Sequence, residues 1–279
     1  MVNIGLIGAG SLGSALALRM HQRGLKINAI VSKTGSRAET LSEKVQCRSA
    51  GTNIELLKDS NVIFIAVPDS QIPDVAERLL PISYRAKTVT FAHTSGTLTS
   101  SAFQRLKEIN TSKMYIASVH PMQTFPRKIV WNKERLANHF ENIYFGVEGE
   151  AAALKNIGKI IKQIGGQCVR IPKKFKALYH MGGVFSSNFL LAILHMSKNL
   201  YAHADINEAN TIKILMPIII QTLKNMKDFG IDAALTGPAS RNDSVIIKRH
   251  LNQLAQFEPK YRKVYRDLTK ICYQIAAQK

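Results

Sequence analysis

Three glycines near the start of the chain have a spacing that suits phosphate binding. They occur in the run Gly8-Ala9-Gly10-Ser11-Leu12-Gly13, which follows a strand-like run at 2–7 and precedes a helical pattern at 11–23. In such a turn the first glycine permits the tight bend, the second lets a pyrophosphate approach the backbone, and the third lets the helix pack closely on the strand. The N–H groups at the helix N-terminus then bind the phosphates. This context favours a dinucleotide site over an ordinary glycine-rich turn, with the predicted contacts Gly8, Gly10, Ser11, Leu12 and Gly13.

The end of the second expected strand, at 27–31, indicates which dinucleotide binds. An NAD site places an Asp or Glu about 20 residues past the glycines, where it bonds the ribose 2′-hydroxyl. Here Ser32 takes that place, Lys33 and Arg37 follow, and the first carboxylate is Glu39. Because hydroxyls and cations stabilise a 2′-phosphate, we predict NADP(H), with Ser32, Lys33 and Arg37 at that phosphate. The alternative is that Lys33 and Arg37 are solvated loop charges.

Chemically versatile side chains follow three further strands, at the edge of the sheet where open α/β folds bind ligands. Val67-Pro68-Asp69 is expected near the ribose and pyrophosphate of the cofactor. His93, in His93-Thr94-Ser95-Gly96, and His120, in His120-Pro121-Met122-Gln123-Thr124-Phe125, are expected to face one pocket near the nicotinamide. A histidine there can act as general acid or base, or can hydrogen-bond a carbonyl oxygen as hydride arrives. The alternative is that each histidine satisfies backbone groups of its own turn.

Four residues in the second half of the chain are further candidates for a role in catalysis. Lys176 and His180 are four apart on an expected helix that also carries Asn188, and these side chains could orient and protonate a carbonyl or imine. Arg241 could bind a substrate carboxylate bidentately. In the alternative, Lys176 is solvated, His180 is a core or interface residue, and Arg241 is a structural ion-pair partner. Gly182-Gly183 is costly inside a helix, which predicts that another element or the cofactor packs closely there.

The expected elements place these residues in two domains. Strands that are apolar on both faces alternate with helical patterns as far as Pro172, as is typical of a parallel sheet covered on both sides. After Pro172 only helices are expected, at 174–201, 206–229, 243–256 and 259–278. We therefore predict a Rossmann-like, mostly parallel, doubly wound α/β domain at 1–172 and an all-α domain at 173–279. The expected strands are 2–7, 27–31, 46–49, 62–67, 88–91, 115–119, 142–147 and 167–171.

Composition narrows the ligand class and the compartment. The chain of 279 residues carries 38 Lys and Arg against 19 Asp and Glu, a net charge of +19 that favours anionic ligands. It contains no zinc finger, aromatic-basic RNA motif or basic heptad region, so no specific nucleic-acid partner is predicted. The three cysteines form no CxxC pair, and we expect neither a disulfide framework nor a metal site. There is no signal-peptide pattern, and wholly apolar stretches such as 214–220 are too short to span a bilayer, so we expect a soluble cytoplasmic protein.

Together these motifs resemble a family of bacterial NADP oxidoreductases. The resemblance covers nearly the whole chain and implies an N-terminal Rossmann-like domain followed by a helical domain of unknown function. The architecture is similar to that of pyrroline-carboxylate reductases, ketopantoate reductases and hydroxyisobutyrate-type dehydrogenases. In those relatives the helical domain commonly builds a homodimer, and the active site lies between the domains. The residues that carry the resemblance are His93-Thr94-Ser95-Gly96, His120-Pro121-Met122-Gln123-Thr124-Phe125, Lys176, His180, Ser187-Asn188, Leu235-Thr236-Gly237-Pro238, Arg241, Asp243 and His250.

One position departs from the family pattern. Asn242 stands where the family usually has Gly, between Arg241 and Asp243. Asn adopts left-handed backbone geometry more readily than most residues, so we expect the loop to keep its shape.

The leading hypothesis is an oxidoreductase that transfers hydride between NADP(H) and a small carboxylated carbonyl, imine or alcohol. The cofactor supplies the chemistry, and the protein supplies position and charge. The alternative is a redox sensor that binds NADP(H) through the same glycine turn but does not turn it over.

Overall fold

A computed structural model describes residues 2–80, 88–109, 114–126 and 139–278 of the chain. They form two compact units, Met1–Ser187 and Asn188–Lys279, and each unit is described by itself. The segment 173–187, which lies beyond the boundary expected at Pro172, belongs to the first unit.

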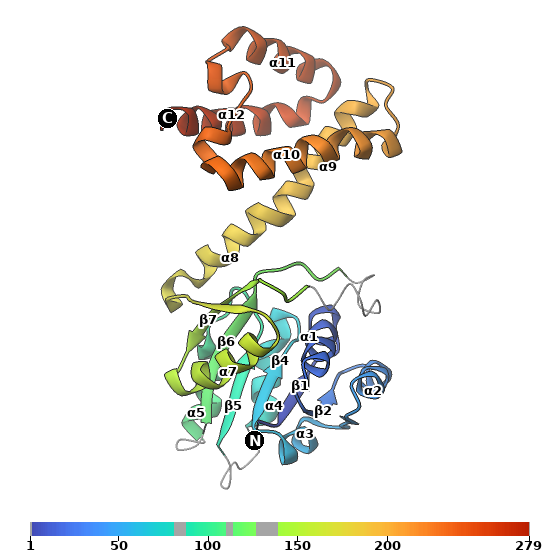
Figure 1. The fold of residues 1–279 in the computed structure, drawn as a ribbon, viewed down its shortest axis with the longest axis vertical. Helices are drawn as coiled ribbons and strands as arrows, with labels where there is room; N and C mark the ends of the chain where they lie inside the picture. Colours follow the sequence, from blue (N-terminus) through green and yellow to red (C-terminus); the bar gives the residue numbers. More distant parts are fainter. Residues whose placement is uncertain (1, 81–87, 110–113, 127–138, 279) are drawn as a thin grey trace. The chain divides into compact units, whose positions relative to one another are not determined.

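The first unit is built on one eight-stranded sheet with the order β3-β2-β1-β4-β5-β6-β7-β8 (Figure 1). Every neighbouring pair is parallel except β6 and β7, which are antiparallel. This confirms the prediction of a mostly parallel, Rossmann-like sheet. The strands are β1 (Ile4–Ile7), β2 (Ile27–Val31), β3 (Arg48–Ser49), β4 (Val62–Ile65), β5 (Val89–His93), β6 (Met114–Pro121), β7 (Tyr144–Gly149) and β8 (Gln167–Arg170).

Helices cover both faces of this sheet because its strands are apolar on both faces. Along β4, Val62 and Phe64 point into one hydrophobic cluster, whereas Ile63 and Ile65 point into the other. The first cluster holds side chains of α1 (Ser11–Gln22), α2 (Gly35–Lys44) and α7 (Ala151–Gln163). The second holds side chains of α3 (Asn53–Asp59), α4 (Ile72–Leu79) and α5 (Gln104–Ile109).

The strand order reverses between β1 and β4. The chain runs outward from β1 to β2 and β3, then returns to pair β4 on the other side of β1. In open α/β sheets such a switch point opens a crevice beyond the carboxyl ends of the strands. The glycine-rich turn follows β1 directly, so it lies at that edge.

A long helix leaves the sheet after β8. It comprises α8 (Lys176–Val184), a π-helical turn (Phe185–Phe189) and α9 (Leu190–Ala202). A side chain at Gly183 would collide with Met122, since a Cβ there would lie 2.8 Å from Met122 Sδ. The Gly182-Gly183 pair therefore does allow another element to pack closely, as its position inside a helix predicts.

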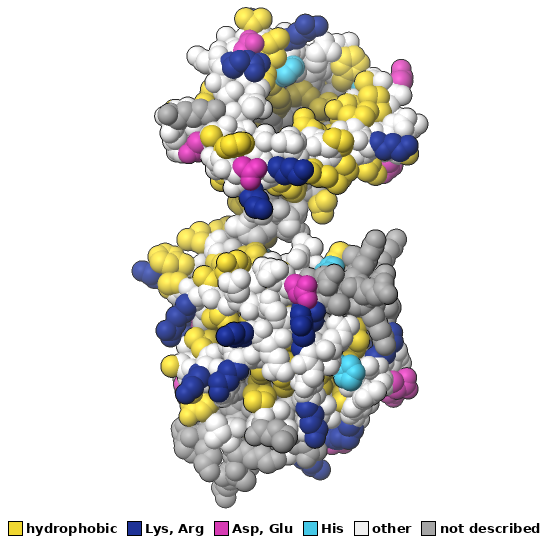
Figure 2. Space-filling view, viewed as in Figure 1, with side chains coloured by type: hydrophobic (Ala, Val, Ile, Leu, Met, Phe, Trp, Pro, Cys, Tyr) yellow, Lys and Arg dark blue, Asp and Glu magenta, His cyan; other side chains and the backbone are white. Residues whose placement is uncertain are grey.

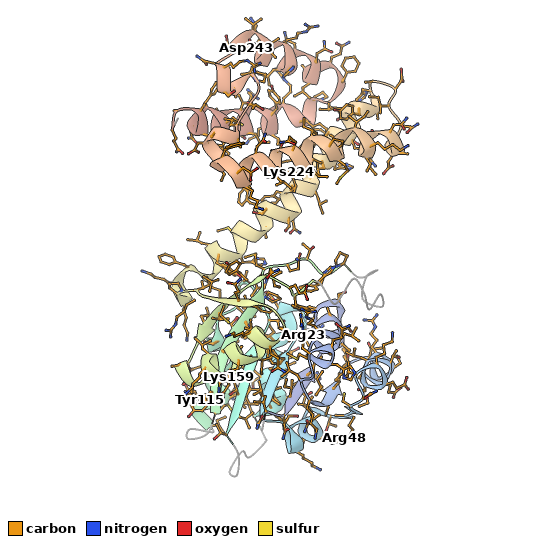
Figure 3. All side chains as sticks on the ribbon, viewed as in Figure 1. Arg23, Arg48, Tyr115, Lys159, Lys224 and Asp243 are labelled. Atoms are coloured by element: carbon orange, nitrogen blue, oxygen red, sulfur yellow. The ribbon has the colours of Figure 1, made fainter. Side chains whose placement is uncertain are left out.

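The second unit is helical. It contains α9, α10 (Glu208–Ala234), α11 (Ser244–Phe257) and α12 (Arg262–Ala276). Gly230 breaks α10 with φ +83°. Asp243, which is labelled in Figure 3, caps α11 by accepting a hydrogen bond from the Ile246 N–H. Asn242 is left-handed, with φ +54°, so the residue that replaces the family's glycine adopts a conformation that Asn tolerates.

The second unit buries little of its own apolar surface. Among its described residues only Thr211 and Leu254 are buried, while five large apolar side chains between Ile212 and Ile220 are at least 44% exposed. Hydrophobic side chains accordingly cover much of this unit in Figure 2. By length and composition the helical run Lys173–Ala202 could cross a membrane, and none of its most apolar window is buried.

Candidate functional site

The glycine-rich turn has the three backbone features that a dinucleotide requires. Gly8 has φ +106°, and a Cβ there would lie 2.4 Å from the Ala66 carbonyl oxygen. A Cβ on Gly13 would lie 2.1 Å from the Gly8 carbonyl oxygen, so the helix packs directly on the turn. Gly10 faces open space, with no atom within 4 Å of its Cβ position. Gly8 thus makes the tight bend, Gly13 allows the helix to pack closely, and Gly10 leaves the backbone open to a ligand, as expected from the sequence.

The first turn of α1 can receive a phosphate. Gly10 is the N-cap residue and, lacking a side chain, it does not cap the helix. Ser11 and Leu12 are half-buried beside it. The N–H groups at this end of the helix, together with the positive end of its dipole, fit a pyrophosphate.

The residues expected at the 2′-phosphate lie next to this turn. Ile7 of β1 pairs in register with Val31 of β2, so Ser32 follows the strand beside Gly8. Lys33 and Arg37 are both exposed, and Arg37 lies in the first turn of α2. Two exposed cationic side chains thus stand shortly after the end of β2.

Asp69 connects the end of β4 to the loop after β5. Its Oδ2 accepts hydrogen bonds from Ser95 Oγ at 2.7 Å and from Thr97 Oγ1 at 2.8 Å. Val67, two residues before it, lies against the glycine turn, since its Cγ1 would be 3.0 Å from a Cβ on Gly8. The structure therefore gives Asp69 a role in shaping the loop that carries Gly96.

His93 is buried beneath the same loop. Its Nδ1 accepts a hydrogen bond from the Ser95 N–H, which places the ring proton on Nε2, and Nε2 donates to the Thr99 carbonyl at 3.0 Å. Burial lowers the pKa of His93 to about 4, outweighing the hydrogen bond to Thr99. Both ring nitrogens of His93 thus form hydrogen bonds to backbone groups of the loop that follows it, as the alternative interpretation of this histidine expects.

His120 and His180 come together as a pair over Gly96. Their ring centroids are 5.5 Å apart at an interplanar angle of 72°. A Cβ on Gly96 would lie 2.1 Å from His180 Cδ2 and 3.0 Å from His120 Nε2, so the pair fits only because residue 96 has no side chain. The structure therefore unites a strand-end histidine with the histidine of the expected Lys176–His180 helix.

Tyr179 holds the opposite side of His120. The two rings meet edge to face, at 5.7 Å and 89°. Tyr179 also packs on Gly146, which is paired with His120 across β6 and β7, because a Cβ on Gly146 would lie 2.3 Å from Tyr179 Cζ. The Gly146 N–H donates to the Tyr179 hydroxyl at 3.1 Å, and burial raises the pKa of that phenol.

A buried polar network supports this cluster from below. Lys176 is 1% exposed, and its Nζ donates to Ser118 Oγ at 2.5 Å. Ser118 Oγ in turn donates to the Ser95 carbonyl at 3.2 Å. Glu148, paired with Ser118 across the sheet, accepts hydrogen bonds from the backbone N–H and the hydroxyl of Ser100.

The electrostatics assign different protonation states to Lys176 and His120. Burial lowers the pKa of Lys176 to about 8, against the opposing charges of Glu148 and Asp69. Burial and the nearby charges of His180 and Lys176 lower the pKa of His120 to about 4, although Asp69 opposes this. At neutral pH, His120 is therefore a neutral hydrogen-bonding group, and Lys176 is an ammonium that can release a proton.

Two of the candidate catalytic residues belong to the second unit. Asn188 lies in the π-helical turn and Arg241 closes a short 3₁₀ helix, so neither is placed relative to the pair over Gly96. Among the described residues, no group of three His, Cys, Asp or Glu side chains could hold a metal ion.

Sequence reasoning missed four residues of this site, namely Tyr179, Ser118, Glu148 and Ser100. Each acts through contacts between residues that are 23 to 59 positions apart in the sequence, such as Tyr179 with His120. The one available signal was Gly146, since a glycine inside a strand often marks close approach of another element.

Comparison with known families assigns both parts of the chain. Residues 3–90 match the family described as NADP oxidoreductase coenzyme F420-dependent, and residues 143–271 match a domain of unknown function, DUF2520. The chain thus combines an NADP oxidoreductase domain with a DUF2520 domain, which confirms the resemblance found in the sequence. No curated protein matches the chain.

Solved structures share the fold over the whole chain. Protein BF3122 from Bacteroides fragilis, provisionally named an NADP oxidoreductase, is 21% identical with a TM-score of 0.77 and 98% of both chains covered. Protein TM1727 from Thermotoga maritima is 25% identical with a TM-score of 0.75, covering 99% of this chain and 98% of that one. A Plasmodium falciparum pyrroline carboxylate reductase with NADP bound is 13% identical with a TM-score of 0.60, covering 99% and 98%. The protein therefore shares its fold with these structures, among them a pyrroline carboxylate reductase.

The neutral, buried state of His93 predicts acid sensitivity. Because its folded pKa of about 4 lies below the ordinary value of 6.5, the unfolded chain binds more protons, and stability falls as the pH drops from 6.5 to 4. A shift of this size is equivalent to about 3 kcal/mol in the free energy of unfolding. We expect His93→Gln, measured by urea unfolding at several pH values, to be less stable at pH 7 but less dependent on pH below 6.5.

His195→Gln is the matched control, since His195 is exposed in the second unit. It should leave the pH dependence of unfolding as in the wild type. Parallel pH profiles for the wild type and His93→Gln would contradict this account of His93.

Proposed function

We propose that the protein is an NADP(H)-dependent oxidoreductase acting on a small carboxylated carbonyl, imine or alcohol. The observation that carries the proposal is the His120–His180 pair over Gly96. Gly96 lies in the loop after β5, and β5 is two strands from β1 along the same edge of the sheet. The two histidines, which could hydrogen-bond a substrate oxygen, thus lie at the edge of the sheet where the nicotinamide of a bound dinucleotide is expected. The excess positive charge favours an anionic substrate. We expect the enzyme to act in the cytoplasm.

The proposed cofactor contacts lie at the glycine turn and at the end of β2. The N–H groups of Ser11, Leu12 and Gly13 would hold the pyrophosphate, and Ser32, Lys33 and Arg37 would hold the 2′-phosphate. When bound, NADP(H) supplies or accepts the hydride.

The protein would contribute hydrogen bonding and a proton. Reduction of a carbonyl or imine adds a hydride to carbon and requires one proton on the oxygen or nitrogen. Lys176, an ammonium with a pKa of about 8, is the proposed source of that proton. His120, neutral at physiological pH, would hydrogen-bond the reacting oxygen and so favour its developing negative charge. Asn188 and Arg241 stay proposed substrate contacts, with Arg241 suited to a carboxylate.

The apolar surface of the second unit supports a homodimer. A unit whose described residues include only two buried side chains gains stability if a second copy covers its exposed face. We propose that two chains associate through the helical domain.

NADPH should bind more tightly than NADH. If Arg37 binds the 2′-phosphate, Arg37→Ala should weaken NADPH binding about tenfold and leave NADH binding unchanged, because one charge-assisted hydrogen bond contributes about 1.5 kcal/mol or more. The measurement is a fluorescence or calorimetric titration with each nucleotide. Lys26→Ala removes an equal charge just before β2, at the strand's other end, and should change neither affinity.

Equal affinities of the intact protein for NADPH and NADH would contradict the assignment of NADP(H).

Oxidation of NADPH is then measured with a panel of keto acids and cyclic imines. Tight binding without oxidation across the panel would favour the redox sensor over the enzyme.

The dimer is tested by the solution mass. Light scattering after size exclusion should give twice the chain mass of 31.0 kDa. Ile218→Asp places a charge in the exposed apolar stretch of α10 and should shift the protein towards monomer, whereas Gln221→Asp, at a polar position of the same helix, should not. A wild-type protein that is monomeric at micromolar concentration would contradict the proposal.

A further inference from the structure

The motif Leu235-Thr236-Gly237-Pro238 has no role in the proposed function, yet it forms part of a cavity. The cavity has a volume of about 260 Å³. Thr236, Pro238 and Ala239 line it from the loop between α10 and α11. The remaining walls come from α11 and α12, which pack side by side (Figure 1). All of the lining residues therefore belong to the second unit.

The helical walls of this cavity are apolar, because the hydroxyls that α12 contributes are bonded elsewhere. The Tyr265 hydroxyl lies 2.7 Å from His250 Nδ1. Thr269 Oγ1 donates to the Tyr265 carbonyl at 2.7 Å. Ile247 of α11 and Leu268 of α12 add hydrocarbon to these walls. Since an apolar cavity of about 150 Å³ can hold benzene, this one has room for a six-membered ring or a branched chain of similar size.

The loop wall is fixed by its own hydrogen bonds. The Asp243 N–H donates to the Pro238 carbonyl at 2.9 Å, and the Asn242 N–H donates to the Ala239 carbonyl at 3.2 Å. A ligand therefore meets a preformed wall and has little of the loop to order on binding.

The same loop carries a cation. Arg241 follows Ala239 by two residues in one 3₁₀ turn. It is exposed, and the salt bridges among the described residues of the second unit involve other side chains. A guanidinium binds a carboxylate through two parallel hydrogen bonds. The cavity and this arginine together are complementary to a molecule with one carboxylate and a compact apolar body.

We propose that this cavity binds the apolar body of a small carboxylate whose charged group is bound by Arg241. The identification of that carboxylate as the substrate rests on the proposed function, in which Arg241 contacts the substrate. The inference narrows the substrate to an acid with a ring or a branched side chain, in preference to one as small as pyruvate.

Occupancy of the cavity can be measured without cofactor or turnover. Cys272 lines the cavity, so its alkylation by iodoacetamide, followed by mass spectrometry, reports whether a ligand is present. The exposed Cys168 of the first unit is the control within the same chain. Phenylacetate is the probe, phenylacetamide lacks its charge, and acetate lacks its ring.

In the wild-type protein we expect phenylacetate to slow alkylation of Cys272 saturably and to leave that of Cys168 unchanged. Phenylacetamide should bind about tenfold more weakly, because it loses a charge-assisted hydrogen bond, and acetate should give no protection. Alkylation of Cys272 at the same rate with and without phenylacetate would overturn the inference. A Cys272 that is unreactive in the ligand-free protein would also overturn it, since a second copy of the chain would then cover the cavity.

Two variants separate the apolar body from the charge. Ala239→Leu enlarges a lining side chain and should abolish protection by phenylacetate, whereas Ala255→Leu, at an exposed position of α11 away from the cavity, should not. Arg241→Ala should weaken phenylacetate about tenfold and leave phenylacetamide unchanged, and Arg249→Ala, also exposed on α11, should change neither. Protection in Ala239→Leu equal to that in the wild type would contradict the inference.

Turnover separates this inference from the proposed function. If the wild type oxidises NADPH with keto acids, Ala239→Leu should raise the KM for phenylpyruvate and leave that for pyruvate unchanged. Equal changes for both acids would contradict a role of the cavity in recognising the substrate. Absence of NADPH oxidation by the wild type would count against the proposed function, whereas alkylation of Cys272 would still decide whether the cavity binds a carboxylate.

Discussion

The candidate site depends on two positions that have no side chain, Gly96 in the loop after β5 and Gly146 within β7. The His180 ring fills the space beside Gly96, and the Tyr179 ring fills the space beside Gly146. These two residues are consecutive in α8, and both rings contact His120. A methyl group at either position would overlap a ring by more than half an ångström and force α8 away from the sheet. Backbone packing of a helix onto a sheet edge thus determines the geometry of the imidazole pair.

The buried charges below this contact are tolerated because they are paired and hydrogen-bonded. An isolated ammonium in a protein interior is strongly unfavourable, and burial alone would neutralise it. Lys176 retains a pKa of about 8 because the charges of Glu148 and Asp69 oppose the effect of burial. Its Nζ also donates a hydrogen bond to Ser118 Oγ. The same burial keeps His120 neutral, so one environment separates the protonation states of the two groups that are proposed to act on the substrate.

The sequence predicted the parts of the site that depend on local geometry, and it missed those that depend on register. The backbone geometry of Gly8, Gly10 and Gly13 follows from a strand, a turn and a helix that are contiguous, and the structure has the bend, the close packing and the open space expected there. His93 was expected in the pocket, but its neighbours Ser95 and Thr99 take both ring nitrogens, a competition that spacing does not reveal. Tyr179 was overlooked because its role requires the antiparallel pairing of β6 with β7, which only tertiary structure fixes.

The most direct test of the central claim is a crystal structure of the protein with NADPH bound. The account predicts that the pyrophosphate lies on the N-terminus of α1, that Lys33 or Arg37 binds the 2′-phosphate, and that the nicotinamide ends beside His120 and His180, with room between for a small substrate. A nicotinamide directed away from the pair over Gly96 would contradict the assignment of this cluster as the active site.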